Sequence, residues 1–347
     1  MMATLLSKNR LVGLLTAAQK LRVGVIGDFT LDGYWYADMT RSVLSRETPL
    51  YPRPVVRETY SCGGAANVAW NLADLGVDKV LALTVLGQDW RGDLLRRVLT
   101  DARVDLETTL TSPDWSTPFY GKVMLTGVGT RQEDARLDFI NTQALPSAAE
   151  AALVAQLEAC LPGLDALVIA DYQTMGMATP TVIAALNSLA QRYPRVPFIV
   201  DSRDQVSHFK GMVMKPNDLE AGRWFFPGHR PDEVTLDELQ LAGSAWQATG
   251  SQPLYITLGE KGCMTFFKGE VWRLPAVAVK PPIDTVGAGD TFLAALACGL
   301  AAGGEPWEAG LLANLSTGVT IQKLGVTGTA TPAEILALAD SSGWVGS

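Results

Sequence analysis

The chain has 347 residues, of which 48% are hydrophobic and 18% charged, and its formal net charge at pH 7 is −8. This composition excludes a disordered chain, and the lack of long basic runs argues against nucleic acid as a partner. The four cysteines are far apart and only two histidines are present, which disfavours a structural zinc site and suits a cytoplasmic protein.

The first part of the chain predicts a helix, a strand and two acids in a functional position. Residues 1–20 are typical of an amphipathic helix rather than a signal peptide. Residues 22–27 (RVGVIG) predict a buried strand of an α/β sheet. Asp28 and Asp32 follow that strand, and ligands gather at the carboxyl ends of strands in open α/β sheets. For Asp28, a substrate contact and a turn-capping carboxylate are both open.

Two segments have the alternating aromatic and β-branched residues of short strands outside the main sheet. They cover about 33–60 and 115–139. We expect them to form a small β-sheet that acts as a lid and excludes water from a site. Its edge strands need covering, so we expect a homodimer formed through the lid. Between the two segments, Gly63 and Gly64 precede a helix that ends near residue 75, and such a pair permits either close packing or ligand approach.

The remaining pattern alternates strands and helices. We expect strands at 80–86, 166–170, 197–200, 213–214 and 254–258, a hairpin at 263–274, and helices at 91–102, 147–161, 180–191, 232–249 and 307–322, with one more starting near 220. This predicts a single α/β domain over 1–347 with a mostly parallel sheet covered on both faces. The longest apolar run, 292–302, is too short to cross a bilayer, so no membrane partner is expected.

Residues 284–302 carry the strongest chemical signal. Gly287 and Gly289 lie in a loop before an Ala-rich helix expected from Thr291, and such a loop directs successive N–H groups at an anion. Asp290 beside it is either a helix cap or a general base for phosphoryl transfer to a hydroxyl. The chain has no GxxxxGK[ST] motif, and its first strand is not followed by GxGxxG, which argues against a Walker-type site and a dinucleotide-binding oxidoreductase.

Four motifs in order carry a resemblance to a known family. They are GGAAN (63–67), KPNDLE (215–220), TLGEKG (257–262) and DTVGAGDTF (284–292). With them the chain, over roughly 22–340, resembles the PfkB (ribokinase-like) carbohydrate kinases. The resemblance implies a three-layer α/β/α fold with a small β-sheet lid, and an ATP- and Mg²⁺-dependent kinase for a sugar or sugar phosphate.

Other stretches resemble one branch of that family. GDFTLDGYWY (27–36), RETYSCGGAANVAWNLADLG (57–76), RLDF (136–139) and ADYQ (170–173) are similar to kinases that phosphorylate heptose 7-phosphate at O1. The loop that follows Asp171 lacks the lysine usual in that branch. A kinase for ribose, fructose or a nucleoside is therefore an alternative, and so is a non-catalytic sugar-binding regulator of the same fold.

The chain departs from that branch at a second place, and three other arginines are candidates for a substrate phosphate. Arg203, in Asp-Ser-Arg, stands where that branch usually has Asp-Pro-Lys or Asp-Pro-Arg. Arg41, Arg46 and Arg136 are candidates to hold a substrate phosphate through bidentate hydrogen bonds, or to pair with nearby acids.

The resemblance also assigns roles to individual residues. Asp290 would accept the hydroxyl proton, and the amides of Gly287, Ala288 and Gly289 would form the anion hole. Sugar contacts would come from Asp32, Gly63, Gly64, Asn67, Arg136 and Asp138, and nucleotide contacts from Asn217, Thr257, Gly259, Gly262 and Asn314. Asn217 and Glu220 would place Mg²⁺ through water, although their spacing is also a helix-capping pattern. Asp284 would belong to a loop that binds a monovalent cation such as K⁺.

Overall fold

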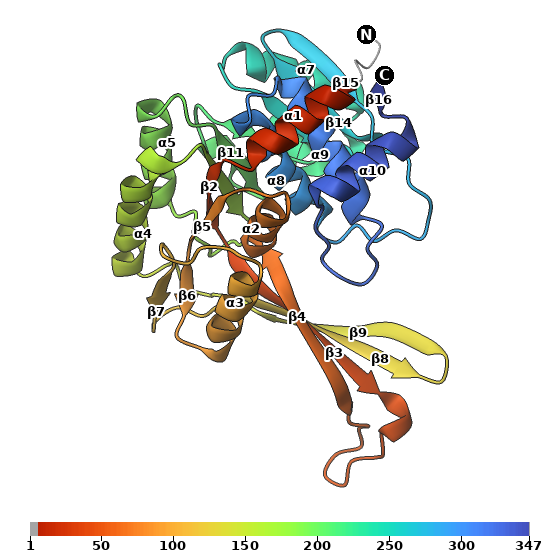
Figure 1. Cartoon of the computed structure of the whole chain (residues 1–347). Helices are drawn as coiled ribbons and strands as arrows, with labels where there is room; N and C mark the ends of the chain where they lie inside the picture. Colours follow the sequence, from red (N-terminus) through yellow and green to blue (C-terminus); the bar gives the residue numbers. More distant parts are fainter. Residues whose placement is uncertain (1–5, 347) are drawn as a thin grey trace.

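The structure, a computed structural model, describes residues 6–346 and is centred on an eight-stranded sheet (Figure 1). The strand order is β15-β14-β13-β12-β11-β10-β2-β5. Neighbouring strands from β13 to β5 are parallel, and the hairpin β14–β15 adds an antiparallel edge. The bounds are β2 (Arg22–Gly27), β5 (Lys79–Leu83), β10 (Ala166–Asp171), β11 (Phe198–Ser202), β12 (Val213–Met214), β13 (Leu254–Thr257), β14 (Cys263–Phe267) and β15 (Glu270–Leu274).

Helices cover both faces of this sheet and enclose two apolar cores. One core includes α1 (Lys8–Ala18), α2 (Ala65–Asp74), α3 (Trp90–Asp101), α8 (Ala288–Ala301), α9 (Pro306–Thr320) and α10 (Pro332–Ser342), and the other α4 (Ser147–Cys160), α5 (Pro180–Arg192), α6 (Asp218–Phe225) and α7 (Leu236–Ala248). Successive strand side chains point to opposite faces, so in β10 Val168 joins the first core while Leu167 and Ile169 join the second. Burial on both faces explains the continuous apolar runs in these strands.

A second sheet projects from this body as a narrow arm (Figure 1). Its order is β4-β3-β8-β9, with β3 and β8 parallel and the outer pairs antiparallel. The bounds are β3 (Phe29–Asp38), β4 (Val55–Gly64), β8 (Phe119–Gly127) and β9 (Thr130–Phe139). Its strands thus lie within or close to the two segments for which the sequence predicts a lid sheet.

Short elements complete the described chain. β1 (Leu6–Ser7) pairs with β16 (Val345–Gly346), β6 (Val85–Gly87) pairs with β7 (Leu110–Ser112), and the 3₁₀ turns are η1 (Met39–Arg41), η2 (Leu161–Gly163), η3 (Val206–His208), η4 (Pro231–Glu233) and η5 (Gly259–Lys261). The expected N-terminal helix is α1, and residues 1–5 of that prediction lie outside the described residues. None of the helices in residues 6–346 is both long and apolar enough to cross a membrane.

The α/β class and the mostly parallel sheet are confirmed, with three local differences. The expected strand 80–86 is divided at Thr84, whose hydroxyl donates to the Gly27 carbonyl. The helix expected from Thr291 begins at Ala288, because the left-handed Gly287 turns the chain into it. Helix α10 has no counterpart among the expected helices, although its Thr-x-x-Glu capping box is a sequence signature of a helix start.

Candidate active site

A cleft of about 540 Å³ opens where the central strands end, beside the N-terminus of α8. Its walls come from elements distant in sequence: Asp32 lies on β3, Asp201 on β11, Thr257 on β13 and Asp290 on α8. The volume is within the range of small-molecule sites. The parallel sheet therefore brings the predicted residues together at its carboxyl edge.

The first turn of α8 presents backbone amides to the cleft. Gly287 has φ 79°, a left-handed conformation that favours glycine, and a Cβ there would lie 2.8 Å from Asn67 Nδ2. The Ala288 N–H donates to the Thr285 carbonyl at 3.2 Å, whereas the amides of Gly289 and Asp290 have no protein acceptor within the described chain. Unpaired donors at the positive end of a 14-residue helix favour a bound anion.

The Asp290 carboxylate is held from two sides. Asn67 Nδ2 donates to Oδ2 at 2.8 Å, and the Tyr172 hydroxyl lies 3.0 Å from Oδ1. The side chain makes no capping bond to α8, so the helix-cap alternative does not describe it. Desolvation raises the Asp290 pKa to about 6, with Asp201 adding to the rise and the bonds from Asn67 and Tyr172 opposing it. Asp290 is therefore ionised at neutral pH.

A buried ion pair borders Asp290. Lys215 Nζ lies 2.8 Å from Asp201 Oδ2, and both side chains line the cleft. Burial disfavours the ammonium, but the charges of Asp201 and Glu220 outweigh it and the pKa of Lys215 is raised. A fixed positive charge thus faces the same space as the α8 amides.

The Asn-x-x-Glu motif forms the capping box of α6. Asn217 Oδ1 accepts from the Glu220 N–H and Glu220 Oε2 accepts from the Asn217 N–H, both at 2.8 Å. The capping pattern is therefore present, and both residues also line the cleft. The box uses one carboxylate oxygen of Glu220, which leaves Oε1 for a ligand. Burial, followed by the charge of Asp201, raises the Glu220 pKa.

The residues expected to contact the nucleotide all line the cleft: Asn217, Thr257, Gly259, Gly262 and Asn314. Gly262 has φ 86°, and a Cβ there would lie 2.1 Å from the Leu274 carbonyl oxygen, so only glycine fits. Asn314 Nδ2 donates to the Pro275 carbonyl at 2.9 Å.

Asp32 offers an unpaired acceptor. Its Oδ1 is buried and has no hydrogen-bond partner in the described structure. Burial raises the Asp32 pKa to about 7, with Lys122 opposing the rise. Gly63 on the neighbouring strand makes room for this carboxylate, since a Cβ there would lie 2.2 Å from Oδ1. A buried oxygen left unpaired beside a cleft suits a donor from a ligand.

Four predicted residues do not line the cleft. Gly63 packs behind Asp32, and the side-chain amide of Asn67 donates a hydrogen bond to Asp290. Arg136 and Asp138, both on β9, pair with each other in a bidentate bond of 2.8 and 2.6 Å. The geometry therefore does not support direct contacts between a sugar and any of these four residues.

Arg203 is the arginine that does line the cleft, near Tyr120 and Gln173. No carboxylate of residues 6–346 lies within ion-pair distance of its guanidinium. By contrast, Arg41 pairs with Asp38 at 3.0 Å. The free positive charge at this part of the cleft is therefore Arg203.

Asp28 lies behind the cleft and organises the loop after β10. Its buried carboxylate accepts from the amides of Tyr172, Gln173 and Met177, each at 2.8 Å. The burial raises its pKa to about 6, against the effect of these three bonds. Of the two alternatives for Asp28, the structure shows a carboxylate that caps a turn.

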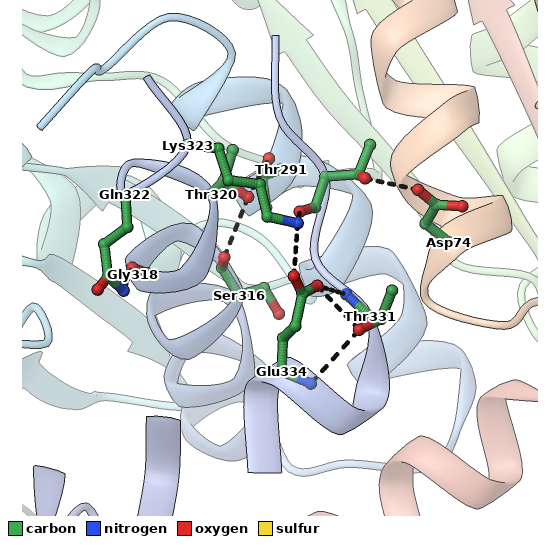
Figure 2. Close-up of polar contacts among 10 residues, drawn as sticks. Asp74, Thr291, Ser316, Gly318, Thr320, Gln322, Lys323, Thr331 and Glu334 are labelled. Carbon is green, nitrogen blue, oxygen red and sulfur yellow. Dashed lines mark hydrogen bonds and ion pairs between the residues drawn. The ribbon is translucent and has the colours of Figure 1, made fainter. Parts of the chain in front are cut away.

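A further predicted residue, Asp284, also lies outside the cleft. It helps to brace the loop from α9 to α10, other bonds of which are drawn in Figure 2. Its carboxylate accepts from the amides of Val286 and Gly325 at 3.0 and 2.9 Å. Lys323 Nζ contacts the Thr329 carbonyl at 2.7 Å and Glu334 at 2.8 Å. The Thr329 hydroxyl in turn donates to Asp74 at the end of α2. A Cβ at Gly287 would lie 2.9 Å from Thr327 Cγ2, so the braced loop passes close to Gly287.

The sequence prediction did not name several residues that line the cleft. They are Thr30, Tyr120, Tyr172, Gln173, Asp201, Lys215, Asp218, Leu219, Phe292 and Thr317. Asp201, Tyr172 and Lys215 directly end or follow strands of the sheet, so the rule that ligands gather at strand ends is the signal that identifies them.

Comparison with known proteins identifies the family. The sequence profile described as pfkB family carbohydrate kinase matches residues 38–334. The chain belongs to this family. The bifunctional protein HldE of Trichlorobacter lovleyi is 33% identical over 335 residues, covering 96% of this chain and 65% of that protein, and HldE of Pelobacter propionicus is 34% identical, covering 90% and 62%. The chain thus spans less than two thirds of the length of these relatives.

Solved structures confirm the ribokinase-like fold. Arabidopsis thaliana ribokinase complexed with ribose and ATP superposes with a TM-score of 0.69 at 18% identity, covering 92% of this chain and 98% of that one. Escherichia coli phosphofructokinase-2 in complex with potassium gives 0.71 at 17% identity, with 93% and 99% covered. The pfkB kinase is therefore an α/β protein of this fold, as the resemblance implies.

Proposed function

We propose that this pfkB kinase transfers the γ-phosphoryl group of ATP to a hydroxyl of a sugar phosphate, with heptose 7-phosphate, phosphorylated at O1, as its substrate. The observation that carries the proposal is that Asp290 shares one cleft with unpaired α8 amides and with Asp32, whose Oδ1 is unpaired. One carboxylate can bind a sugar hydroxyl while the other takes the proton of the attacking hydroxyl.

Asp290 would act as the general base. Its carboxylate accepts the proton of the attacking oxygen as that oxygen bonds to phosphorus and the bond to the departing ADP oxygen breaks. The amides of the first turn of α8, together with Lys215, would stabilise the charge on the phosphoryl oxygens. Because the transition state of such transfers is loose, positioning and charge stabilisation supply most of the rate.

The residues present fit Mg²⁺ held with substrate phosphates. The described residues contain no group of three or more His, Cys, Asp or Glu side chains that could cage a metal. Mg²⁺ is usually bound by one or two carboxylates plus water and phosphate oxygens, and Glu220 Oε1 supplies such an oxygen beside Asn217. When bound, Mg²⁺ neutralises charge on the ATP phosphates.

Asp284 would be the charged group of a site for a monovalent cation, as the resemblance implies. Each of its carboxylate oxygens accepts a single backbone N–H, so lone pairs remain for an ion. Replacing K⁺ by tetramethylammonium at constant ionic strength tests this, and a rate that does not change would assign Asp284 to bracing the loop alone.

Arg203 supports a substrate that already carries a phosphate. Its unpaired guanidinium borders the cleft beside Tyr120 and Gln173, and arginine binds phosphate through parallel N–H bonds. Arg136 is engaged with Asp138 and is less available for that role. We therefore assign the distal phosphate to Arg203.

We extend the proposal to the second sheet as a lid and a dimer contact. The sheet contributes Asp32 and Tyr120 to the cleft, so its motion would open or close the sugar end. Leu137, Phe139 and Ile140 are exposed at one end of its outer strand, which favours a second copy as cover. Sedimentation of the full chain should give a dimer, and a monomer at working concentration would contradict this contact.

The test is ADP release with a panel of acceptors: heptose 7-phosphate, the free heptose, ribose, fructose, fructose 6-phosphate and a nucleoside. We expect the highest kcat/KM for heptose 7-phosphate. The variant Arg203→Gln should lower kcat/KM for phosphorylated acceptors by about 10- to 100-fold through KM, and should leave free sugars unaffected. The exposed Arg195 lies away from the cleft, and Arg195→Gln is the matched control.

The outcomes separate the alternatives. Preference for ribose, fructose or the nucleoside would move the assignment to another kinase of the family. Sugar binding by calorimetry without ADP release for any acceptor would identify a non-catalytic regulator.

A further inference from the structure

The Tyr172 hydroxyl lies between two carboxylates but carries only one hydrogen. Its oxygen is 3.0 Å from Asp290 Oδ1 and 3.1 Å from Asp201 Oδ2. A phenol donates a single O–H bond, and an ionised carboxylate can only accept. When both acids are ionised, one of the two contacts therefore lacks a proton.

The loop that carries Tyr172 is fixed by hydrogen bonds to the carboxylate of Asp28. Asp28 accepts from the amides of Tyr172 and Gln173 at 2.8 Å, and also from Met177 further along the loop. Asp28 is 1% exposed, so these bonds are shielded from water. The backbone at Tyr172 is thereby held in place. The phenol oxygen lies between the two carboxylates, and its hydrogen can change acceptor by rotation about the C–O bond.

The two acceptors differ in what else they contact. Asp201 Oδ2 is paired with Lys215, whereas Asp290 receives only the neutral amide of Asn67. The charged groups that face Asp290 are Asp32 from β3, Asp201 from β11 and Lys215 after β12. In the resting site the hydrogen therefore stabilises Asp290 more than Asp201, because Asp201 already has a cation.

Proton transfer reverses this preference. Once Asp290 holds the proton of the substrate hydroxyl, it can itself donate, and its need for the phenol hydrogen disappears. Asp201 stays ionised beside Lys215 and accepts that hydrogen instead. The O–H bond of Tyr172 never breaks in this sequence; the one covalent proton transfer runs from the substrate oxygen to Asp290.

We propose that Tyr172 is a positioning residue for the base, whose hydroxyl donates to Asp290 before phosphoryl transfer and to Asp201 after it. This rests on the proposed role of Asp290 as the base. The hydrogen bond favours the ionised base at rest, and the alternative acceptor keeps the hydroxyl paired once the base is protonated.

The first experiment measures kcat and KM against pH for the full chain and for Tyr172→Phe. We expect kcat to fall about 10- to 100-fold with KM little changed, because a hydrogen bond to a charged group is removed. The acid limb of kcat should move to higher pH by about one unit, since the ionised base loses a donor. The control is Tyr255→Phe, which removes a buried hydroxyl bonded to the Pro306 carbonyl. It should leave kcat and the pH of its acid limb unchanged.

A double variant separates positioning from general damage to the loop. In Asp290→Asn the base is absent, so adding Tyr172→Phe should change the remaining rate by less than about twofold. If Tyr172→Phe lowers the rate of Asp290→Asn by as large a factor as it lowers the rate of the wild-type chain, Tyr172 has a structural role and the proposal is overturned.

A measurement without turnover distinguishes failure of this inference from failure of the proposed function. Titration of the aspartate side-chain ¹³C signals, with Asp290 assigned from the Asp290→Asn spectrum, should show a higher midpoint for Asp290 in Tyr172→Phe. If no acceptor is phosphorylated but this midpoint moves, the proposed function fails and the Tyr172–Asp290 coupling stands. An unchanged midpoint overturns the coupling, whether or not the chain is an active kinase.

Discussion

The two sheets of this protein contrast in burial and in what they give to the cleft. All six residues of β10 in the central sheet are buried, whereas all ten residues of β9 in the projecting sheet are exposed. The central body supplies Asp290, the α8 amides and Lys215, while the projecting sheet supplies Asp32 and Tyr120.

This difference separates two tasks in the proposed reaction. The groups that handle the phosphoryl transfer are held by a packed core and by hydrogen bonds that fix their positions. The sugar end depends on β3 and β8, which lie between the largely exposed strands β4 and β9 of a sheet that projects from the body and can move or be covered by another molecule. Variants of the phosphoryl-transfer groups and of the residues that hold them should therefore change kcat or stability, and variants of the sugar-binding residues in the projecting sheet should change KM.

The largest effect is expected for Asp290→Asn. The loss of a general base should lower kcat by about 10²- to 10⁴-fold. The fold should not weaken. Burial raises the pKa of Asp290 to about 6, above the usual value of an aspartate, so the ionised carboxylate lowers stability as pH rises through this range. Kinetics with thermal melts at pH 7.5 check both points. A rate near that of the wild type would remove Asp290 from the mechanism.

The next effect, on stability, is expected for Asp28→Ala. Three amides lose their buried acceptor, and the free energy of unfolding should fall by about 3 kcal/mol or more. Urea unfolding measures it, with the exposed Asp78→Ala as the control. If Asp28→Ala were as stable as the control, the three bonds to Asp28 would not stabilise the central body, and the proposed contrast in rigidity between the two sheets would fail.

Asp32→Asn tests the sugar end. Its carboxyl group keeps a buried unpaired oxygen beside the cleft, and replacing one carboxyl oxygen by an amide nitrogen should raise the KM for the sugar by about 10-fold or more, with a smaller change in kcat. Steady-state kinetics with saturating ATP measure the split. A fall confined to kcat would place Asp32 with the phosphoryl-transfer groups. It would contradict the proposal that the projecting sheet serves sugar binding alone.

The smallest effect is expected for Lys323→Met in the loop of Figure 2. The partly exposed ammonium loses the Thr329 carbonyl and Glu334, which should lower stability by about 1 kcal/mol. The KM for ATP and for the sugar should not change, because Lys323 does not line the cleft. A change in KM would show that this loop takes part in binding.

Much of the central body could be predicted from local sequence. Strands buried on both faces are continuous apolar runs, so β2 and β12 have the bounds expected for them, and the glycines before Asp290 already indicate an anion site. The projecting strands are less regular, because exposed faces constrain residue type weakly. Their approximate position could be predicted, but their pairing could not.

The sequence by itself determined the fold class and indicated the glycine loop before α8 as an anion site, since both depend on short-range patterns. Only the tertiary structure decided which side chains share a hydrogen bond. Arg136 was a candidate for a phosphate and is engaged by Asp138, while Arg203 is left unpaired in the cleft. Tyr172 meets Asp290 across 118 residues of chain, a contact that no local pattern encodes because parallel strand order, rather than sequence distance, sets which strand ends are neighbours.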